Sequence, residues 1–142
     1  MTSPFTSLTG KLLQLPTRIS ILGVNIDDVT EDEAIRLIDS MVSQRGLYQI
    51  ATINPEFVME ANRDPLVMQV LNSAVLATPD GIGIVWAAWM LGQPIRERLT
   101  GVQLVERIAK QTALRGWRVY FLGSAPGVAE KAAQVLRHRY PG

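Results

Sequence analysis

The sequence contains no cysteine and a single histidine, His138, among its 142 residues. The absence of cysteine excludes a disulfide scaffold, a thiolate zinc site and a cysteine nucleophile, and it fits a reducing compartment. One histidine also excludes a histidine-rich metal cluster within one chain. His138 stands between two arginines, which is typical of a solvated helix end.

The chain also lacks a strong net charge and a long apolar run. Its formal net charge is +1, and no basic tract with interleaved aromatic residues occurs, so nucleic acid is not an expected partner. The longest apolar run, IGIVWAAWML, has about half of the ~20 residues that a membrane-spanning helix needs. The N-terminus lacks the basic start and continuous apolar stretch of a secretory signal. These absences predict a soluble, cytoplasmic protein, with at most peripheral contact at the inner face of the membrane.

The sequence contains enough apolar residues to form the core of one folded domain. Apolar residues make up 47% of the chain and charged residues 19%, which argues against disorder. Residues 1–17, with Pro4, Gly10 and Pro16, predict a poorly ordered leader, and residues 18–142 predict a single domain.

Strand-like and helix-like segments alternate along that domain. β-branched and apolar runs predict strands at 18–27 (with a turn near Gly23), 47–53, 74–78 and 117–123. Apolar periodicity and capping residues predict helices at 30–46, 54–73 (divided near Asp64-Pro65), 81–92, 102–116, and from 124 onward with Pro126 in the first turn. Thr30 and Glu33 are spaced as a capping box. This alternation predicts an α/β fold with a mainly parallel sheet covered by helices on both faces.

Ligands of such sheets bind beyond the carboxyl ends of the strands, which singles out the loops TINPE, TPDGIG and GSAPG. Asp80 in the second loop has two interpretations. It predicts either an N-cap for the helix that follows or a base that accepts a proton from a substrate hydroxyl. Gly81 and Gly83 would leave room for a ligand near the backbone.

The neighbouring loops also allow structural and functional interpretations. Asn54 is suited to capping the helix that starts at Pro55, while Thr52 and Asn54 together could hold sugar hydroxyls. The GSAPG turn, with Gly123 and Ser124, predicts either a phosphate-binding turn or an ordinary strand-to-helix connection. Arg96 and Arg98 are either solvated or able to clamp a diphosphate.

Trp86 and Trp89 lie three residues apart on an apolar segment. This spacing favours packing in the core or between subunits of a homo-oligomer over a platform that stacks on sugars.

Five segments in order resemble the WecG/TagA/CpsF family of bacterial glycosyltransferases. They are ILGVNIDDVT, TINPEFVMEANRD, ATPDGIGIVWAA, ERLTGVQL and VYFLGSAPGVAEKAAQVL with the later YPG, and they cover residues from about 19 to 142. The resemblance implies a Rossmann-like fold and an inverting transfer of an N-acetylmannosamine-type sugar. The donor would be a UDP-sugar and the acceptor a sugar on a polyprenyl diphosphate, in the synthesis of teichoic acid or other cell-surface polysaccharides.

The resemblance also implies roles for individual residues. Asp80 of the PDG motif would be the catalytic base, and Thr52 would share the catalytic pocket. No cofactor or metal is implied, because the family lacks the Asp-x-Asp metal motif and Asp27-Asp28 is not that motif. The substrate-binding residues implied are Asn54, Gly81, Arg98, Gln103, Gly123 and Ser124.

Family members continue beyond the YPG motif with a C-terminal appendage thought to touch the membrane. The resemblance therefore implies an N-terminal portion of a longer fold. Two other functions stay open: a non-catalytic nucleotide-sugar-binding or oligomerisation module, and a Rossmann-like oxidoreductase. The oxidoreductase is disfavoured, because no G-x-G-x-x-G follows the first strand.

Overall fold

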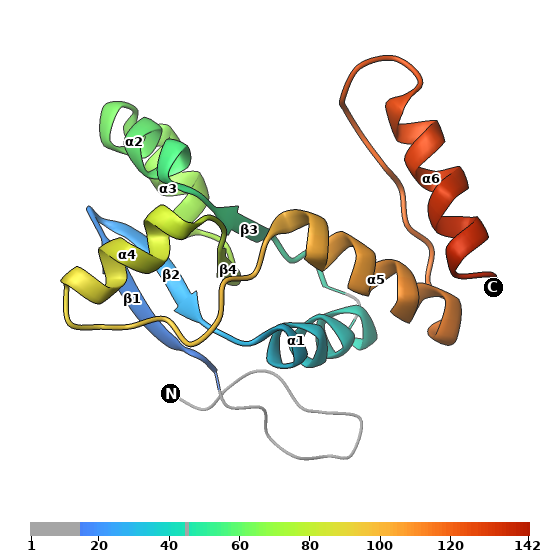
Figure 1. The fold of residues 1–142 in the computed structure, drawn as a ribbon, viewed down its shortest axis with the longest axis horizontal. Helices are drawn as coiled ribbons and strands as arrows, with labels where there is room; N and C mark the ends of the chain where they lie inside the picture. Colours follow the sequence, from blue (N-terminus) through green and yellow to red (C-terminus); the bar gives the residue numbers. More distant parts are fainter. Residues whose placement is uncertain (1–14, 45) are drawn as a thin grey trace. The chain divides into compact units, whose positions relative to one another are not determined.

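The structure of the chain, a computed structural model, describes residues 15–44 and 46–142 (Figure 1). The predicted leader at 1–17 falls almost wholly outside these residues. Contacts group the chain into two compact units, Met1–Gly101 and Val102–Gly142. The first unit contains the strands assigned in the described residues, and each unit is described by itself below.

The first unit opens with an antiparallel hairpin. Strands β1 (Thr17–Ile21) and β2 (Val24–Asp28) pair with Ile19 opposite Ile26. The turn between them consists of Leu22 and Gly23, which both have positive φ, 48° and 86°. Such a two-residue turn matches the twist of paired strands. The expected turn near Gly23 is confirmed, and it divides the predicted segment into two strands.

A parallel pair forms the second sheet. Strands β3 (Ile50–Ile53) and β4 (Leu76–Pro79) pair in register, with Thr52 beside Thr78. The buried carboxylate of Asp27 on β2 accepts a hydrogen bond from the backbone N–H of Ala77 on β4 at 2.7 Å. Arg18 on β1 pairs with the same carboxylate at 2.7 Å. Asp27 thereby joins the hairpin to the parallel pair.

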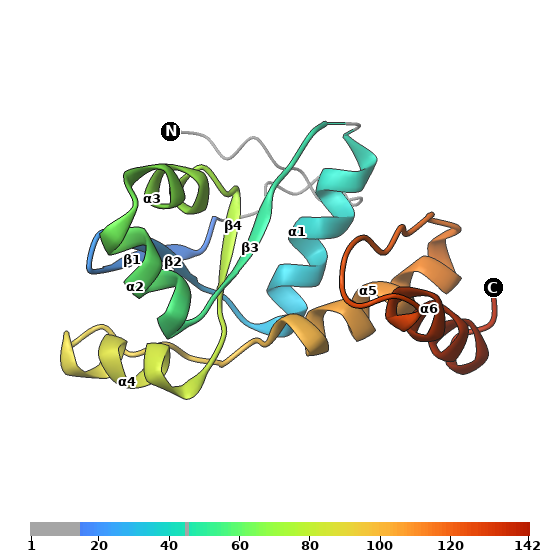
Figure 2. The same ribbon diagram turned by 90° about the horizontal axis from the view of Figure 1, so that it is seen from above.

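Helices cover both faces of the parallel pair. Figure 2 shows α1 (Glu31–Ser43) on one side of β3 and β4, and α2 (Pro55–Arg63) with α3 (Pro65–Asn72) on the other. The capping box of Thr30 and Glu33 is present at the start of α1, as predicted. The division at Asp64-Pro65 is also confirmed, with Asp64 capping α3 through the backbone N–H of Leu66. The mixed architecture with a parallel pair confirms the predicted α/β, Rossmann-like class.

A buried apolar cluster holds the hairpin, the parallel pair and three helices of the first unit together. Helix α4 (Ile82–Met90) contributes two of its members and contacts β1. The cluster consists of Ile19, Ile21, Val24, Ile26, Ala51, Ile53, Val58, Ala61, Leu71, Ala74, Ala77, Ile84, Ala88 and Ile95.

The second unit contains most of α5 (Gly101–Arg115), all of α6 (Val128–Arg139) and the segment between them. Glu106 on α5 accepts hydrogen bonds from Arg139 at 2.7 Å and from the hydroxyl of Tyr140 at 2.9 Å. These two bonds fasten the end of α6 to α5.

Two predictions for the second unit are wrong. The expected strand at 117–123 does not form, because no strand in the described residues pairs with it, and Tyr120 and Leu122 stay almost fully exposed. Pro126 does not lie in the first turn of α6. Gly127, with φ 84°, is the N-cap, so its left-handed conformation separates Pro126 from the helix.

None of the helices in the described ranges is both long enough and apolar enough to cross a membrane.

Candidate functional site

Strands β3 and β4 end side by side, and Asp80 lies at this edge. The backbone N–H of Asp80 donates to the carbonyl oxygen of Ile53 at 2.7 Å, which extends the parallel pairing by one residue. Two of the three loops selected from the sequence, those after Ile53 and Thr78, therefore meet at one place. This is the position where parallel α/β sheets bind ligands.

The side chain of Asp80 does not cap the helix that follows it. The N-cap of α4 is Gly81, and within residues 15–44 and 46–142 no side-chain hydrogen bond caps that helix. The capping interpretation of Asp80 is therefore wrong in the form expected. Instead, Oδ2 of Asp80 accepts a hydrogen bond at 3.0 Å from the backbone N–H of Gly101, the first residue of α5. In the described part of the chain, no hydrogen bond to Oδ1 of Asp80 occurs.

Gly101 brings Asp80 and Thr52 together. A Cβ atom placed on Gly101 would lie 3.4 Å from Oγ1 of Thr52 and 3.7 Å from Oδ2 of Asp80. The hydroxyl and the carboxylate therefore both lie next to the position that a side chain at Gly101 would occupy, and both side chains are half-buried. The sequence analysis did not select Gly101, although it is the glycine of the ERLTGVQL segment.

Asn54 and the two glycines after Asp80 have clear structural roles. Oδ1 of Asn54 accepts a hydrogen bond from the backbone N–H of Phe57 at 2.8 Å, which confirms the predicted cap of α2. Gly81 has a φ of 97°, a conformation that favours glycine. At Gly83 an added Cβ would lie 2.8 Å from Cγ of Pro55. The expected room for a ligand at Gly83 is therefore taken up by Pro55.

The segment Ile95–Gly101, here called the strap, is anchored along its length. Arg96 pairs with Asp28 at 2.8 Å and with Glu33 at 2.7 Å. The backbone N–H of Leu99 donates to the carbonyl oxygen of Pro79 at 2.9 Å, next to Asp80. The strap therefore runs from the start of α1 to the end of β4.

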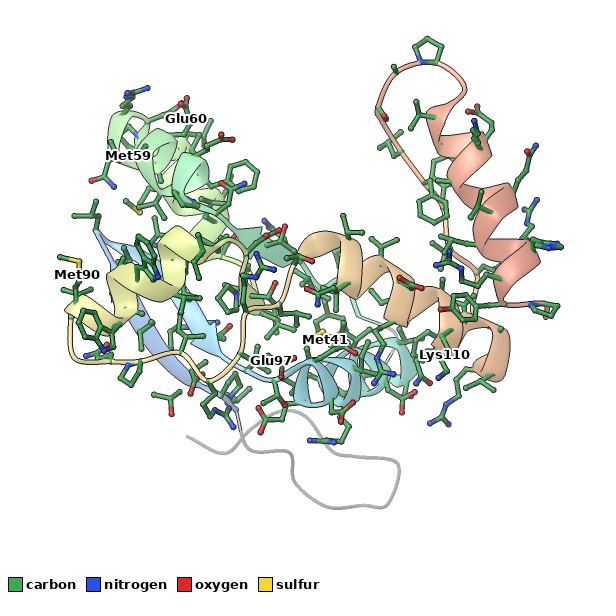
Figure 3. All side chains as sticks on the ribbon, viewed as in Figure 1. Met41, Met59, Glu60, Met90, Glu97 and Lys110 are labelled. Atoms are coloured by element: carbon green, nitrogen blue, oxygen red, sulfur yellow. The ribbon has the colours of Figure 1, made fainter. Side chains whose placement is uncertain are left out.

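A carboxylate of the strap also reaches α1. Oε2 of Glu97 accepts a hydrogen bond from the backbone N–H of Glu31 at 3.2 Å, and Figure 3 shows Glu97 beside the start of that helix. Negative charge is stabilising at a helix N-terminus.

The two arginines of the strap differ in their contacts. Arg96 is engaged by two carboxylates, which raise its pKa, and its hydrogen bond to Glu33 is the main cause of a lowered pKa for that carboxyl. Arg98 is exposed, and it has no ion pair in residues 15–44 and 46–142. Of the two candidates for binding a diphosphate, Arg98 is the one whose guanidinium group is available.

The remaining predicted site residues belong to the second unit. Gln103 lies exposed in the first turn of α5. Gly123 and Ser124 form an exposed turn in which both residues have positive φ, 96° and 70°. The first unit thus brings together Thr52, Asn54, Asp80 and Gly81, while Arg98 lies on the strap three residues before Gly101. Among the described residues, no group of three or more acidic or histidine side chains is arranged to hold a metal ion.

Comparison with known proteins identifies the same family as the five sequence segments. The model of the "Glycosyl transferase WecG/TagA/CpsF family" matches residues 19–142. Proteins from Staphylococcus aureus strains NCTC 8325 and COL, each named "N-acetylglucosaminyldiphosphoundecaprenol N-acetyl-beta-D-mannosaminyltransferase", are 30% identical to the chain over 126 residues. The match covers 87% of this chain and 50% of each relative, so the chain spans about half of their length. The chain, with the Asp80 carboxylate at the end of its parallel strands, belongs to the WecG/TagA/CpsF family of glycosyltransferases.

Proposed function

We propose that this chain serves an inverting transfer of an N-acetylmannosamine-type sugar from a UDP-sugar to a sugar carried on a polyprenyl diphosphate. Family membership and the names of the relatives support this reaction. One structural observation carries it: Asp80 is anchored through Oδ2 to the backbone N–H of Gly101, while Oδ1 accepts no hydrogen bond from the residues that the structure describes. The products would enter teichoic acid or another cell-surface polysaccharide, made in the cytoplasm at the inner face of the membrane.

The proposed step needs one base. An acceptor hydroxyl attacks the anomeric carbon of the donor sugar, and its proton passes to Oδ1 of Asp80. The new carbon–oxygen bond forms as the bond between the anomeric carbon and UDP breaks, so the configuration inverts and UDP departs. The hydroxyl of Thr52, which lies beside Gly101 as Asp80 does, would hold the acceptor hydroxyl in position.

The departing UDP carries negative charge that other groups would offset. The guanidinium of Arg98 is suited to phosphate oxygens because it presents several donors in one plane. Within the same unit, Asn54 and Gly81 would line the substrate site beside Asp80. Neither a metal nor another cofactor is needed in this scheme.

Replacing Asp80 by asparagine tests the proposed base. We expect Asp80→Asn to lower the transfer rate by about 10²–10⁴-fold, the usual contribution of a positioned base. The fold should survive, because the asparagine oxygen still accepts the hydrogen bond from Gly101. The measurement is transfer from UDP-N-acetylmannosamine to a polyprenyl-diphosphate-linked N-acetylglucosamine, together with the unfolding midpoint.

Asp64→Asn is the matched control. Asp64 also accepts a hydrogen bond from a backbone N–H at a helix start, at 2.8 Å, and it lies at the junction of α2 and α3. We expect this variant to retain the wild-type rate. Undiminished transfer by Asp80→Asn would refute the base assignment. Binding of UDP by the wild type without any transfer would instead support the non-catalytic nucleotide-sugar-binding module.

A further inference from the structure

Helix α4 exposes an unusually apolar surface. It contains no charged residue, and Trp86, Trp89 and Met90 are 66%, 71% and 78% exposed. Figure 3 shows Met90 pointing away from the rest of the first unit at the end of the helix. Large apolar side chains gathered on one exposed surface mark a place where something binds.

These side chains line a groove with a defined wall. The chain turns back after α4 through hydrogen bonds from Gln93 to Ala88 and from Gly92 to Trp89, and it then runs beside the helix (Figures 1 and 2). The result is a cavity of about 470 Å³, here called the α4 groove. Its lining residues are Val85, Trp86, Trp89, Met90, Pro94 and Ile95.

Both walls of the α4 groove lead along the chain to the candidate site. Helix α4 begins two residues after Asp80 and, with nine residues, is about 13 Å long. The wall on the other side starts at Pro94 and continues as the strap to Gly101, which bonds to Asp80. Arg98, the arginine with an available guanidinium, lies on the strap between these ends.

We infer that the α4 groove binds the first isoprene units of the polyprenyl chain of the acceptor. This assignment rests on the proposed function, because that function supplies an acceptor in which a sugar, a diphosphate and an isoprenoid follow one another. Followed back along the chain from Gly101, the protein offers matching groups in the same order: Gly101 with its bonded Asp80, then Arg98, then Ile95 and Pro94 in the groove. An uncharged isoprenoid fits a groove whose lining residues are all apolar.

The groove is tested by direct binding of geranylgeranyl diphosphate, with inorganic diphosphate as the second probe, using isothermal titration calorimetry. We expect the wild type to bind the lipid diphosphate more tightly than inorganic diphosphate, with a negative heat-capacity change. Trp89→Ser should lower the affinity for geranylgeranyl diphosphate by about tenfold or more and leave the affinity for inorganic diphosphate unchanged. Trp89→Phe should restore most of the affinity.

Leu66→Ser is the matched control, because Leu66 is similarly exposed but lies on α3, outside the groove. It should leave both affinities unchanged. Should Trp89→Ser fail to fold, Trp86→Ser gives the same test on the other exposed indole. Equal affinity of the wild type for the two probes, or an unchanged affinity for the lipid diphosphate in a folded Trp89→Ser or Trp86→Ser variant, would overturn the assignment.

Two further outcomes identify a different occupant and also overturn it. A wild-type dimer that becomes monomeric in Trp89→Ser, with lipid affinity unchanged, would make the surface a contact between copies of this chain. If Trp89→Ser no longer binds phosphatidylcholine vesicles that the wild type binds, again with its affinity for geranylgeranyl diphosphate unchanged, the surface of α4 would be a membrane contact. Stabilisation by UDP is measured separately, so UDP binding without lipid binding would leave the proposed function standing while the groove assignment fails.

Discussion

Thr78 has a buried hydroxyl group beside the candidate site. It pairs in register with Thr52, its exposed fraction is 0%, and in the described part of the chain its Oγ1 has no hydrogen-bond partner. Burying a hydroxyl without a partner costs free energy that a methyl group of the same shape would not. Thr78 is thus a place where the chain keeps a polar group at a cost to stability.

We therefore expect Thr78→Val to raise the free energy of unfolding by about 1 kcal/mol. Urea denaturation followed by circular dichroism measures the change. Thr52→Val, at the half-buried neighbour, should change stability by less than about 0.5 kcal/mol. A clear loss of stability in Thr78→Val would show that the hydroxyl does bind a partner in solution.

The strap shows how a single element positions the site. Its three anchoring points are Arg96 on Asp28 and Glu33, Glu97 on the first turn of α1, and Leu99 on Pro79. The anchors join residues far apart in the sequence: 68 positions separate Arg96 from Asp28, 66 separate Glu97 from Glu31, and 20 separate Leu99 from Pro79. The strap is held to α1 by charge and to β4 by one backbone hydrogen bond.

The charge-based anchor predicts a pH dependence of stability. The pKa of Glu33 lies below its ordinary value, first because Arg96 donates hydrogen bonds to it and next because Thr30 does. A lowered pKa in the folded state gives stability that is present above the unfolded pKa of about 4.3 and is lost as the pH falls through the folded value. Glu33→Gln keeps the capping box but removes the charge.

We therefore expect Glu33→Gln to melt below the wild type at pH 7, with the difference shrinking as the pH is lowered below about 4. Thermal unfolding monitored by circular dichroism across this range measures it. Glu60 is exposed on α2, and Glu60→Gln should change the melting temperature only slightly and without this dependence on pH. A difference in melting temperature between Glu33→Gln and the wild type that does not change with pH would contradict a stabilising ion pair between Glu33 and Arg96.

At the scale of the whole molecule, the proposed donor predicts which nucleotide stabilises the chain. A ligand that binds only the folded state raises stability by about 2.7 kcal/mol at 100 times its dissociation constant. We therefore expect saturating UDP to raise the unfolding midpoint by several degrees and NAD to leave it unchanged. Stabilisation by NAD alone would favour the oxidoreductase alternative. An unchanged midpoint with UDP would mean that these residues do not form the nucleotide site by themselves.

The sequence alone predicted the features that depend on neighbouring residues. The capping box at Thr30, the break at Pro65, the Asn54 cap and the hairpin turn at Gly23 all depend on groups within a few positions. The position of Asp80 after a buried strand was predictable for the same reason. Five short segments in order were also enough to identify the family, which the comparisons confirmed.

Only the tertiary structure decided which of these residues work together. It assigned the carboxylate of Asp80 to Gly101 instead of the adjacent helix, and it engaged Arg96 while leaving Arg98 available. Among the residues it describes, the structure also gives 117–123 no strand partner, although their composition favours a strand. Hydrogen bonds and ion pairs between distant segments, and strand pairing, depend on where the chain returns in space, which local residue patterns do not specify.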